Sequence, residues 1–143
     1  MTTGSSQIST KFKAKREEVS AEILQSVEKM ASIKGLKEVQ VHMLSLRQRL
    51  LEDNHTLIEH LSIIRRKHRS EKSAQMENIS ENLQHRYQYN EKTVIIEGKT
   101  AQTKEMIELI ENQINFFSES IKTIDNVLFG IKTRVEIEKT LGI

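Results

Sequence analysis

Proline is absent from this chain of 143 residues, and no other feature of the sequence constrains the fold as much. Average usage of about 5% would place roughly seven prolines in a chain of this length. Because only five glycines are present as well, few residues favour turns, which predicts long helices rather than a many-stranded sandwich or barrel. Aromatic residues at 4% and charged residues at 29% fit thin, solvated helices better than a thick core.

Cysteine is absent too, which excludes disulfides, thiolate metal sites and cysteine nucleophiles. The first residues lack the basic-then-apolar pattern of a secretory signal. The longest tightly apolar run, residues 94–96, is far too short to cross a membrane. We therefore expect a soluble, cytoplasmic protein without a membrane partner.

The sequence divides into a polar start and a single helical domain. Residues 1–10 are small and polar and are predicted to form a disordered tail. Residues 11–143 are predicted to form one helical domain with helices over about 11–30, 36–88 and 103–140, and Gly35 marks the break before the second helix. Residues 92–97 are rich in β-branched side chains and precede Gly98, which predicts a short extended segment.

The second predicted helix has apolar residues alternately three and four positions apart. They are Leu36, Val39, Met43, Leu46, Leu50, Leu57 and Ile64, with Asp53 and His60 as polar members of the same row. This spacing is typical of a coiled-coil seam, in which a polar member fixes register or partner at some cost in stability. Leu44, Leu51 and Ile58 form a second row seven residues apart, so we expect this helix to pack against two neighbours.

The last predicted helix has the most regular pattern in the chain. Its apolar residues alternate three and four positions apart without a miss: Ile107, Ile110, Ile114, Phe117, Ile121, Ile124, Leu128, Ile131 and Val135. Isoleucine at both seam positions favours association beyond a parallel dimer, so these residues are predicted to form an oligomerisation seam. The alternative is a helical hairpin in which they pack on residues 36–64 of the same chain. The expected fold is therefore all-α, an elongated hairpin or coiled-coil subunit that forms oligomers.

Motifs for catalysis or metal binding are not found in the sequence. Gly98-Lys99-Thr100 resembles the end of a phosphate-binding loop, but Thr93 stands where that motif needs its first glycine. The five histidines include no pair four residues apart, so no two of them form a helical metal-ligand pair. We expect no catalytic residue, no metal, no cofactor and no enzymatic activity.

A basic cluster is the best candidate for a functional site. Residues 1–75 carry 14 Lys and Arg against 9 Asp and Glu, whereas residues 76–143 carry 8 against 11, and five cations gather at 65–72. Such neighbours repel one another unless an anion such as phosphate neutralises them, although a solvated basic surface is the simpler alternative. Tyrosines beside arginines can also stack on unpaired bases. The predicted nucleic-acid-binding residues are Arg65, Arg66, Lys67, Arg69, Lys72, Arg86, Tyr87 and Tyr89.

Three features resemble the UvsY family of phage recombination mediators. Lys67-x-Arg69 near the end of a long helix is similar to the family's Lys-x-Arg pair for single-stranded DNA, and Lys92-Thr93-Val94 resembles the Lys-Thr-Val before its terminal helix. The third feature is the apolar-lysine pattern of that helix, echoed by Phe116-Phe117, Ile121-Lys122-Thr123-Ile124 and Ile131-Lys132. The similarity covers roughly residues 33–140. The family's tandem tyrosine followed by Ser-Gly is replaced here by residues 71–74, Glu-Lys-Ser-Ala.

The resemblance implies a ring-like homo-oligomer, built through its C-terminal helices, in the cytoplasm of a phage-infected cell. Such a protein binds single-stranded DNA, contacts a single-stranded-DNA-binding protein and loads a RecA-like recombinase in its place, with roles in recombination, repair and replication. A different class remains open from the residues alone: a non-enzymatic coiled-coil structural or adaptor protein, such as a virion, secretion or tethering subunit, whose basic cluster meets an acidic protein.

Overall fold

The computed structural model describes residues 3–81 and 88–142 of the chain. Within these residues the fold is all-α and no strand occurs, which confirms the predicted fold class. The elements are α1 (Thr3–Glu28), a short 3₁₀ helix η1 (Lys29–Ala31), α2 (Ile33–Ser80), α3 (Tyr89–Lys99) and α4 (Ala101–Thr140). At 1.5 Å per residue, the 48 residues of α2 extend over about 70 Å, so the molecule is long and thin.

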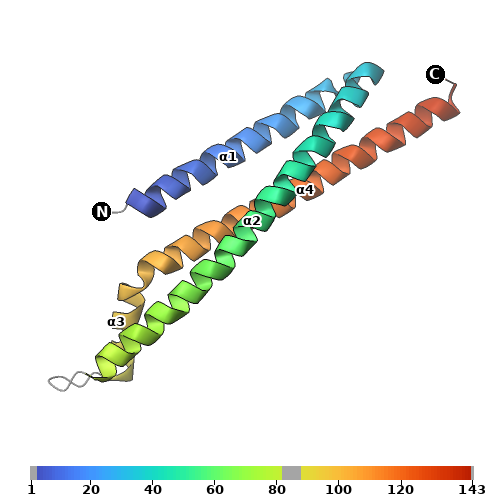
Figure 1. The fold of residues 1–143 in the computed structure, drawn as a ribbon. Helices are drawn as coiled ribbons and strands as arrows, with labels where there is room; N and C mark the ends of the chain where they lie inside the picture. The colour runs from blue at the N-terminus through green and yellow to red at the C-terminus, as the bar shows by residue number, and fades with distance from the viewer. Residues whose placement is uncertain (1–2, 82–87, 143) are drawn as a thin grey trace.

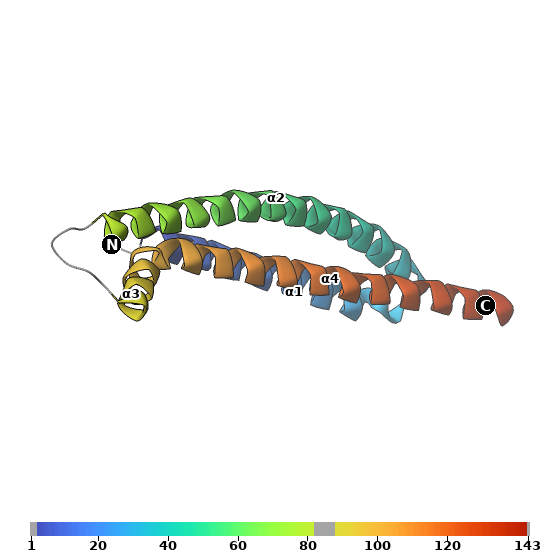
Figure 2. The same cartoon turned by 90° about the horizontal axis from the view of Figure 1, so that it is seen from below.

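The three long helices lie side by side along part of the molecule, and α2 and α4 continue beyond α1. Helices α1 and α4 run in the same direction and α2 runs in the opposite one, with α3 as a short connector at one end (Figure 1). Viewed after a quarter turn, α2 arches over α4, while α1 lies beside α4 (Figure 2). Because α1 has 26 residues, it covers only part of the longer α2–α4 pair.

The turn between α1 and α2 depends on close backbone approach. Ser32 caps α2 through its side chain, which accepts a hydrogen bond of 3.0 Å from the amide of Gly35. A Cβ at Gly35 would collide with the carbonyl oxygen of Lys29, so glycine is required here. Arg134 of α4 donates to the carbonyls of Met30 and Ala31, which holds this turn against the last helix.

The core is a row of apolar side chains contributed by all three long helices. Helix α2 buries the first members of its predicted seam and α4 buries every seventh residue of its own. The buried cluster comprises Val19, Leu36, Val39, Met43, Leu46, Leu50, Phe117, Ile124 and Ile131. Ile121, Leu128 and Val135 pack against it from α4, while Ile110 is buried and Ile107 and Ile114 are half-buried. The C-terminal seam therefore packs on the protein's own α1 and α2, which is the hairpin alternative.

The α2 seam changes register halfway along the helix. His60 is exposed, and Leu61, only 7% exposed, takes the buried position instead. The intervals from Asp53 to Leu57 and from Leu57 to Leu61 are both four residues long. Two successive four-residue intervals locally unwind a coiled-coil repeat. His60 therefore faces the space between α1, α2 and α4, as its place in the row predicts, but the buried row does not continue through it.

Two predicted segments differ from the structure. Residues 3–10 belong to α1 rather than to a disordered tail, because Ile8 and Phe12 lie four apart on one face and line a space against α2 and α4. Residues 92–97 lie within α3 rather than in an extended segment. The helix penalty for β-branched residues is below about 0.7 kcal/mol each, and burial of Ile96 outweighs it. The other boundaries shift: α2 starts at Ile33 and ends at Ser80, and α4 starts at Ala101.

Candidate nucleic-acid interface

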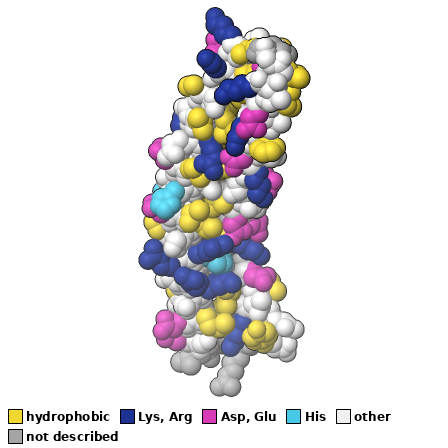
Figure 3. Space-filling model, turned by 90° about the vertical axis from the view of Figure 1, so that its right-hand side faces the viewer, with side chains coloured by type: hydrophobic (Ala, Val, Ile, Leu, Met, Phe, Trp, Pro, Cys, Tyr) yellow, Lys and Arg dark blue, Asp and Glu magenta, His cyan; other side chains and the backbone are white. Residues whose placement is uncertain are grey.

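The basic cluster lies on the second half of α2, beyond the part of that helix that α1 covers. Arg65, Arg66, Lys67 and Arg69 are exposed, and so is Lys72 one turn further on. Figure 3 shows Lys and Arg side chains gathered in a band across the lower half of one face of the molecule. The structure therefore keeps the predicted cations accessible to a ligand.

The helix divides these cations between two sides. Residues two apart in an α-helix are rotated by about 200°, so Lys67 and Arg69 cannot face the same way. Arg65, Arg69 and Lys72, four and seven residues apart, share one side, which we call the first flank. Lys67 lies on the opposite side, the second flank. The two side chains of the Lys67-x-Arg69 pair therefore lie on opposite sides of the helix and do not bind the same phosphate.

The first flank is partly neutralised by α4. Arg65 Nη2 lies 2.7 Å from Glu111 Oε1, and both side chains are about half exposed. This ion pair ties α2 to α4, as does the pair between Arg47 and Asp125 further up the helices. Among the described residues, Arg69 and Lys72 form no such pair. They are the cations of this flank that remain available for an anion.

The second flank opens onto a cavity of about 410 Å³ between α2 and the start of α4. Lys67 from α2 and Lys99 from the end of α3 both line it, so two cations from different helices face one space. Its other lining residues are Ile64, Glu71, Gln75, Gln102, Thr103 and Met106. Lys99 was not among the predicted binding residues, because in the sequence it belongs only to the incomplete phosphate-loop motif. Its basic charge is the only local signal that points to this site.

A polar contact inside the molecule holds the two helices beside this cavity. The Thr103 hydroxyl of α4 donates to Glu71 Oε2 at 2.8 Å and lies 2.9 Å from His68 Nδ1. Thr103 is 9% exposed and lines the cavity together with Glu71, so the contact forms part of the cavity wall. His68 therefore has a structural role between α2 and α4.

The tyrosines and the basic residues of α1 contribute differently. Tyr89 starts α3 and is 79% exposed, so its ring is free to stack. Arg86 and Tyr87 lie outside the described residues. On α1, Lys15 forms an ion pair of 3.6 Å with Asp53, and Arg16 donates to Gln113 at 2.9 Å. These two cations hold α1 in place.

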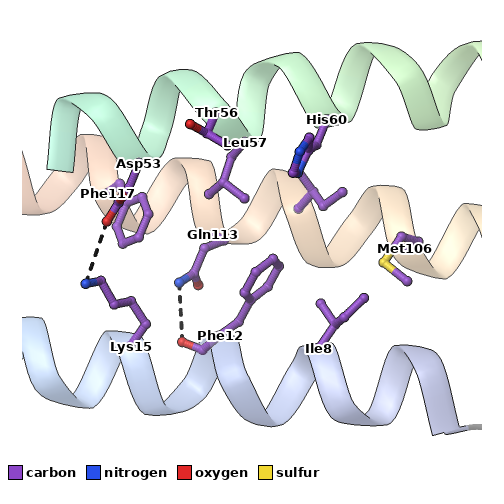
Figure 4. Close-up of a pocket in the computed structure, with 11 residues that line it drawn as sticks. Ile8, Phe12, Lys15, Asp53, Thr56, Leu57, His60, Met106, Gln113 and Phe117 are labelled. Carbon is purple, nitrogen blue, oxygen red and sulfur yellow. Dashed lines mark hydrogen bonds and ion pairs between the residues drawn. The ribbon is translucent and has the colours of Figure 1, made fainter. Parts of the chain in front are cut away.

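A second cavity of about 410 Å³ lies under α1, between α1, α2 and α4 (Figure 4). Figure 4 shows Phe12 and Phe117 turned toward it, with the Lys15–Asp53 pair at one side. Gln113, only 1% exposed, donates to the Phe12 carbonyl at 3.3 Å. The remaining lining residues are Ile8, Thr56, Leu57, His60, Met106 and Ile110. The cavity coincides with the register change in α2, where Asp53 and His60 leave a gap that apolar residues would fill.

The described part of the chain contains neither a candidate metal site nor a candidate membrane span. No group of three or more His, Asp or Glu residues there could hold a metal ion. No helix there is long and apolar enough to cross a membrane.

Comparison with known proteins gives no relative: no family model, no curated protein and no solved structure matches this chain. The interpretation of the site therefore depends on its geometry.

Proposed function

We propose that this chain binds single-stranded DNA through the second half of α2 and acts as a non-enzymatic recombination mediator. The observation that carries the proposal is the set of exposed cations on less than two turns of one helix, without a carboxylate partner among the described residues. They are Arg66, Lys67, Arg69 and Lys72. Their mutual repulsion favours the binding of a polyanion, because phosphate neutralises them and releases counterions.

The distribution of these cations favours a flexible strand over a duplex. Lys67 and Arg69 lie on opposite flanks, so one ligand that contacts both must bend around the helix. Duplex DNA resists such bending because its persistence length is about 50 nm, whereas a single strand follows it readily. Tyr89, exposed at the start of α3, offers a stacking surface that is worth about 1–3 kcal/mol per unpaired base.

The later steps of the proposed activity derive from the resemblance to the UvsY family. In this proposal the chain binds the strand as a homo-oligomer in the cytoplasm of a phage-infected cell. It contacts a single-stranded-DNA-binding protein and loads a RecA-like recombinase in its place. Several modest basic sites on one strand would raise the effective concentration of each, so a weak single site is sufficient.

The binding step is tested by the salt dependence of affinity for an unstructured oligothymidylate, measured by fluorescence anisotropy. The test variant replaces Arg66, Lys67, Arg69 and Lys72 by glutamine. Each lost phosphate contact lowers the slope of log K against log salt by about 0.7 for a single strand, so four lost contacts lower it by about 3.

A matched control removes the same charge elsewhere, at the exposed Lys13, Lys34, Lys37 and Lys132. We expect this control to keep most of the slope. Equal slopes for the two variants, or a wild-type chain without salt-sensitive binding, would contradict the proposed site. The loading step is then measured as the replacement of a single-stranded-DNA-binding protein by a RecA-like recombinase on the single strand. The test variant should not promote this replacement.

An adaptor protein is the second candidate, because an exposed apolar row on α2 is typical of a helix that meets another helix. Leu44 and Ile58 are about half exposed, and Leu51 between them is 37% exposed. If the wild-type chain showed no salt-sensitive affinity for the oligonucleotide but still bound another helix through this row, the adaptor function would be the better description.

A further inference from the structure

The outer face of α2 has a heptad repeat that the described part of the chain leaves uncovered. Leu44, Leu51 and Ile58 stand seven residues apart with 52%, 37% and 48% of their surface exposed. Val41, three residues before Leu44, is 70% exposed. Leu44, Leu51 and Ile58 thus occupy one of the two seam positions of a coiled coil, and Val41, Gln48 and His55 occupy the other.

This is the heptad face that remains available for association. The C-terminal seam, which sequence alone assigned to oligomerisation, packs on α1 and α2 of the same chain. The ion pair between Arg47 and Asp125 sets α4 against this part of α2.

We infer that α2 pairs in parallel with α2 of a second copy of this chain through this face. In a parallel pair each side chain meets its own counterpart, so leucine meets leucine and Gln48 meets Gln48. In an antiparallel pair the alternation would set leucines opposite Gln48 and His55, leaving polar groups against apolar ones. The order of apolar and polar residues along this face therefore favours the parallel orientation.

The charges beside the face agree with this pairing. Arg47 and Glu52 are five residues apart and flank the seam on opposite sides, which is the spacing that forms ion pairs between parallel helices. Arg47 already lies 2.7 Å from Asp125 through Nε, which leaves its terminal nitrogens for a carboxylate of the second copy.

The same repeat continues into the basic cluster. After Ile58, the next residues at seven-residue steps are Arg65 and Lys72, so one face is apolar at first and cationic further along. A parallel pair brings the cationic ends of two copies together, where they repel until an anionic strand bridges them. Self-association and strand binding then strengthen each other by the same factor. This coupling rests on the proposed function, whereas the pairing itself does not.

The orientation is tested by a single cysteine in a chain that has none. Val41→Cys places the two sulfurs together in a parallel pair, whereas in an antiparallel pair Val41 lies opposite Ile58, about 25 Å away along the helix. We expect rapid disulfide dimer formation under mild oxidation. Val94→Cys on α3, with a similar exposed fraction of 68%, is the control and should form little disulfide-linked dimer. Equal dimer yields for the two variants would overturn the inference.

The surface is tested by sedimentation equilibrium of the full chain with and without oligothymidylate. Leu51→Glu should raise the dissociation constant of the pair by at least about 100-fold, because it sets two like charges in an apolar contact. Leu24→Glu, at an exposed leucine of α1, should leave it unchanged. The oligonucleotide should lower the wild-type dissociation constant by about tenfold.

The outcomes separate the two proposals. Wild-type association in Leu51→Glu, or a wild-type chain that is monomeric with and without the oligonucleotide, would overturn the inference while leaving strand binding intact. Loss of association in Leu51→Glu together with no strand binding by any variant would support the pairing and contradict the proposed function. Circular dichroism of each variant establishes that it has folded.

Discussion

Truncation of Ile124 tests whether the C-terminal seam packs within the chain. Ile124 is fully buried in the cluster formed by α1, α2 and α4. Removing a buried isoleucine side chain to alanine costs about 2–5 kcal/mol, from lost burial and from the cavity that remains. For a chain of this size each kcal/mol corresponds to about 2–4 °C, so a central value of about 3 kcal/mol lowers the melting temperature by about 6–12 °C.

Phe129→Ala on the same helix is the control, because Phe129 is 70% exposed. We expect it to change the unfolding free energy by less than about 0.5 kcal/mol. Both variants are measured by urea unfolding at two protein concentrations tenfold apart. An unfolding free energy of Ile124→Ala equal to that of the wild type would contradict the intrachain core. So would a destabilisation that changed with protein concentration while the wild type lost secondary structure on dilution, because the seam would then lie between chains.

Three further variants test local features of the fold by urea unfolding. Gly35→Ala should destabilise the chain by about 1–3 kcal/mol because its Cβ collides with the Lys29 carbonyl, whereas Gly130→Ala, where nothing lies within 4 Å, should stabilise α4 by about 1 kcal/mol; equal effects would contradict the account of the turn. Thr103→Val removes the hydroxyl between His68 and Glu71 and should cost about 1–2 kcal/mol, and an unchanged unfolding free energy would show that this contact does not hold α2 to α4.

The fold class could be predicted because the strongest patterns were long and regular. The seven-residue recurrence of Ile110, Phe117, Ile124 and Ile131 predicts a buried helix face whether its partner is in the same chain or in another. The choice between those partners depends on how the chain turns, and that is set by close contacts such as the one at Gly35. Periodicity alone carries no information about such contacts.

The errors in the fold arose where weak local preferences competed with packing. Residues 92–97 have β-branched side chains, but Ile96 gains burial as part of α3, and this exceeds the small propensity penalty. Gln113 was missed as a core residue because a polar side chain gives no apolar signal. It is buried because Arg16 and the Phe12 carbonyl satisfy its amide.

The candidate site was predictable in composition but not in arrangement. The run from Arg65 to Arg69 identifies a basic helix, and the helical repeat already separates Lys67 from Arg69 by about 200°. The neutralisation of Arg65 by Glu111 and the approach of Lys99 to Lys67 come from distant parts of the chain. Such pairings require tertiary structure, so they could not be deduced from local sequence.

The most direct test of strand binding is a map of contacts between a photoreactive oligothymidylate and the intact wild-type chain, with cross-linked peptides identified by mass spectrometry. We predict cross-links on both flanks of α2, at Lys67 and Lys72, together with Lys99 beside the second-flank cavity, and their loss as salt is raised. Cross-links confined to other lysines, such as Lys34 or Lys132, or a pattern that does not respond to salt, would contradict the proposal that the second half of α2 binds a single strand.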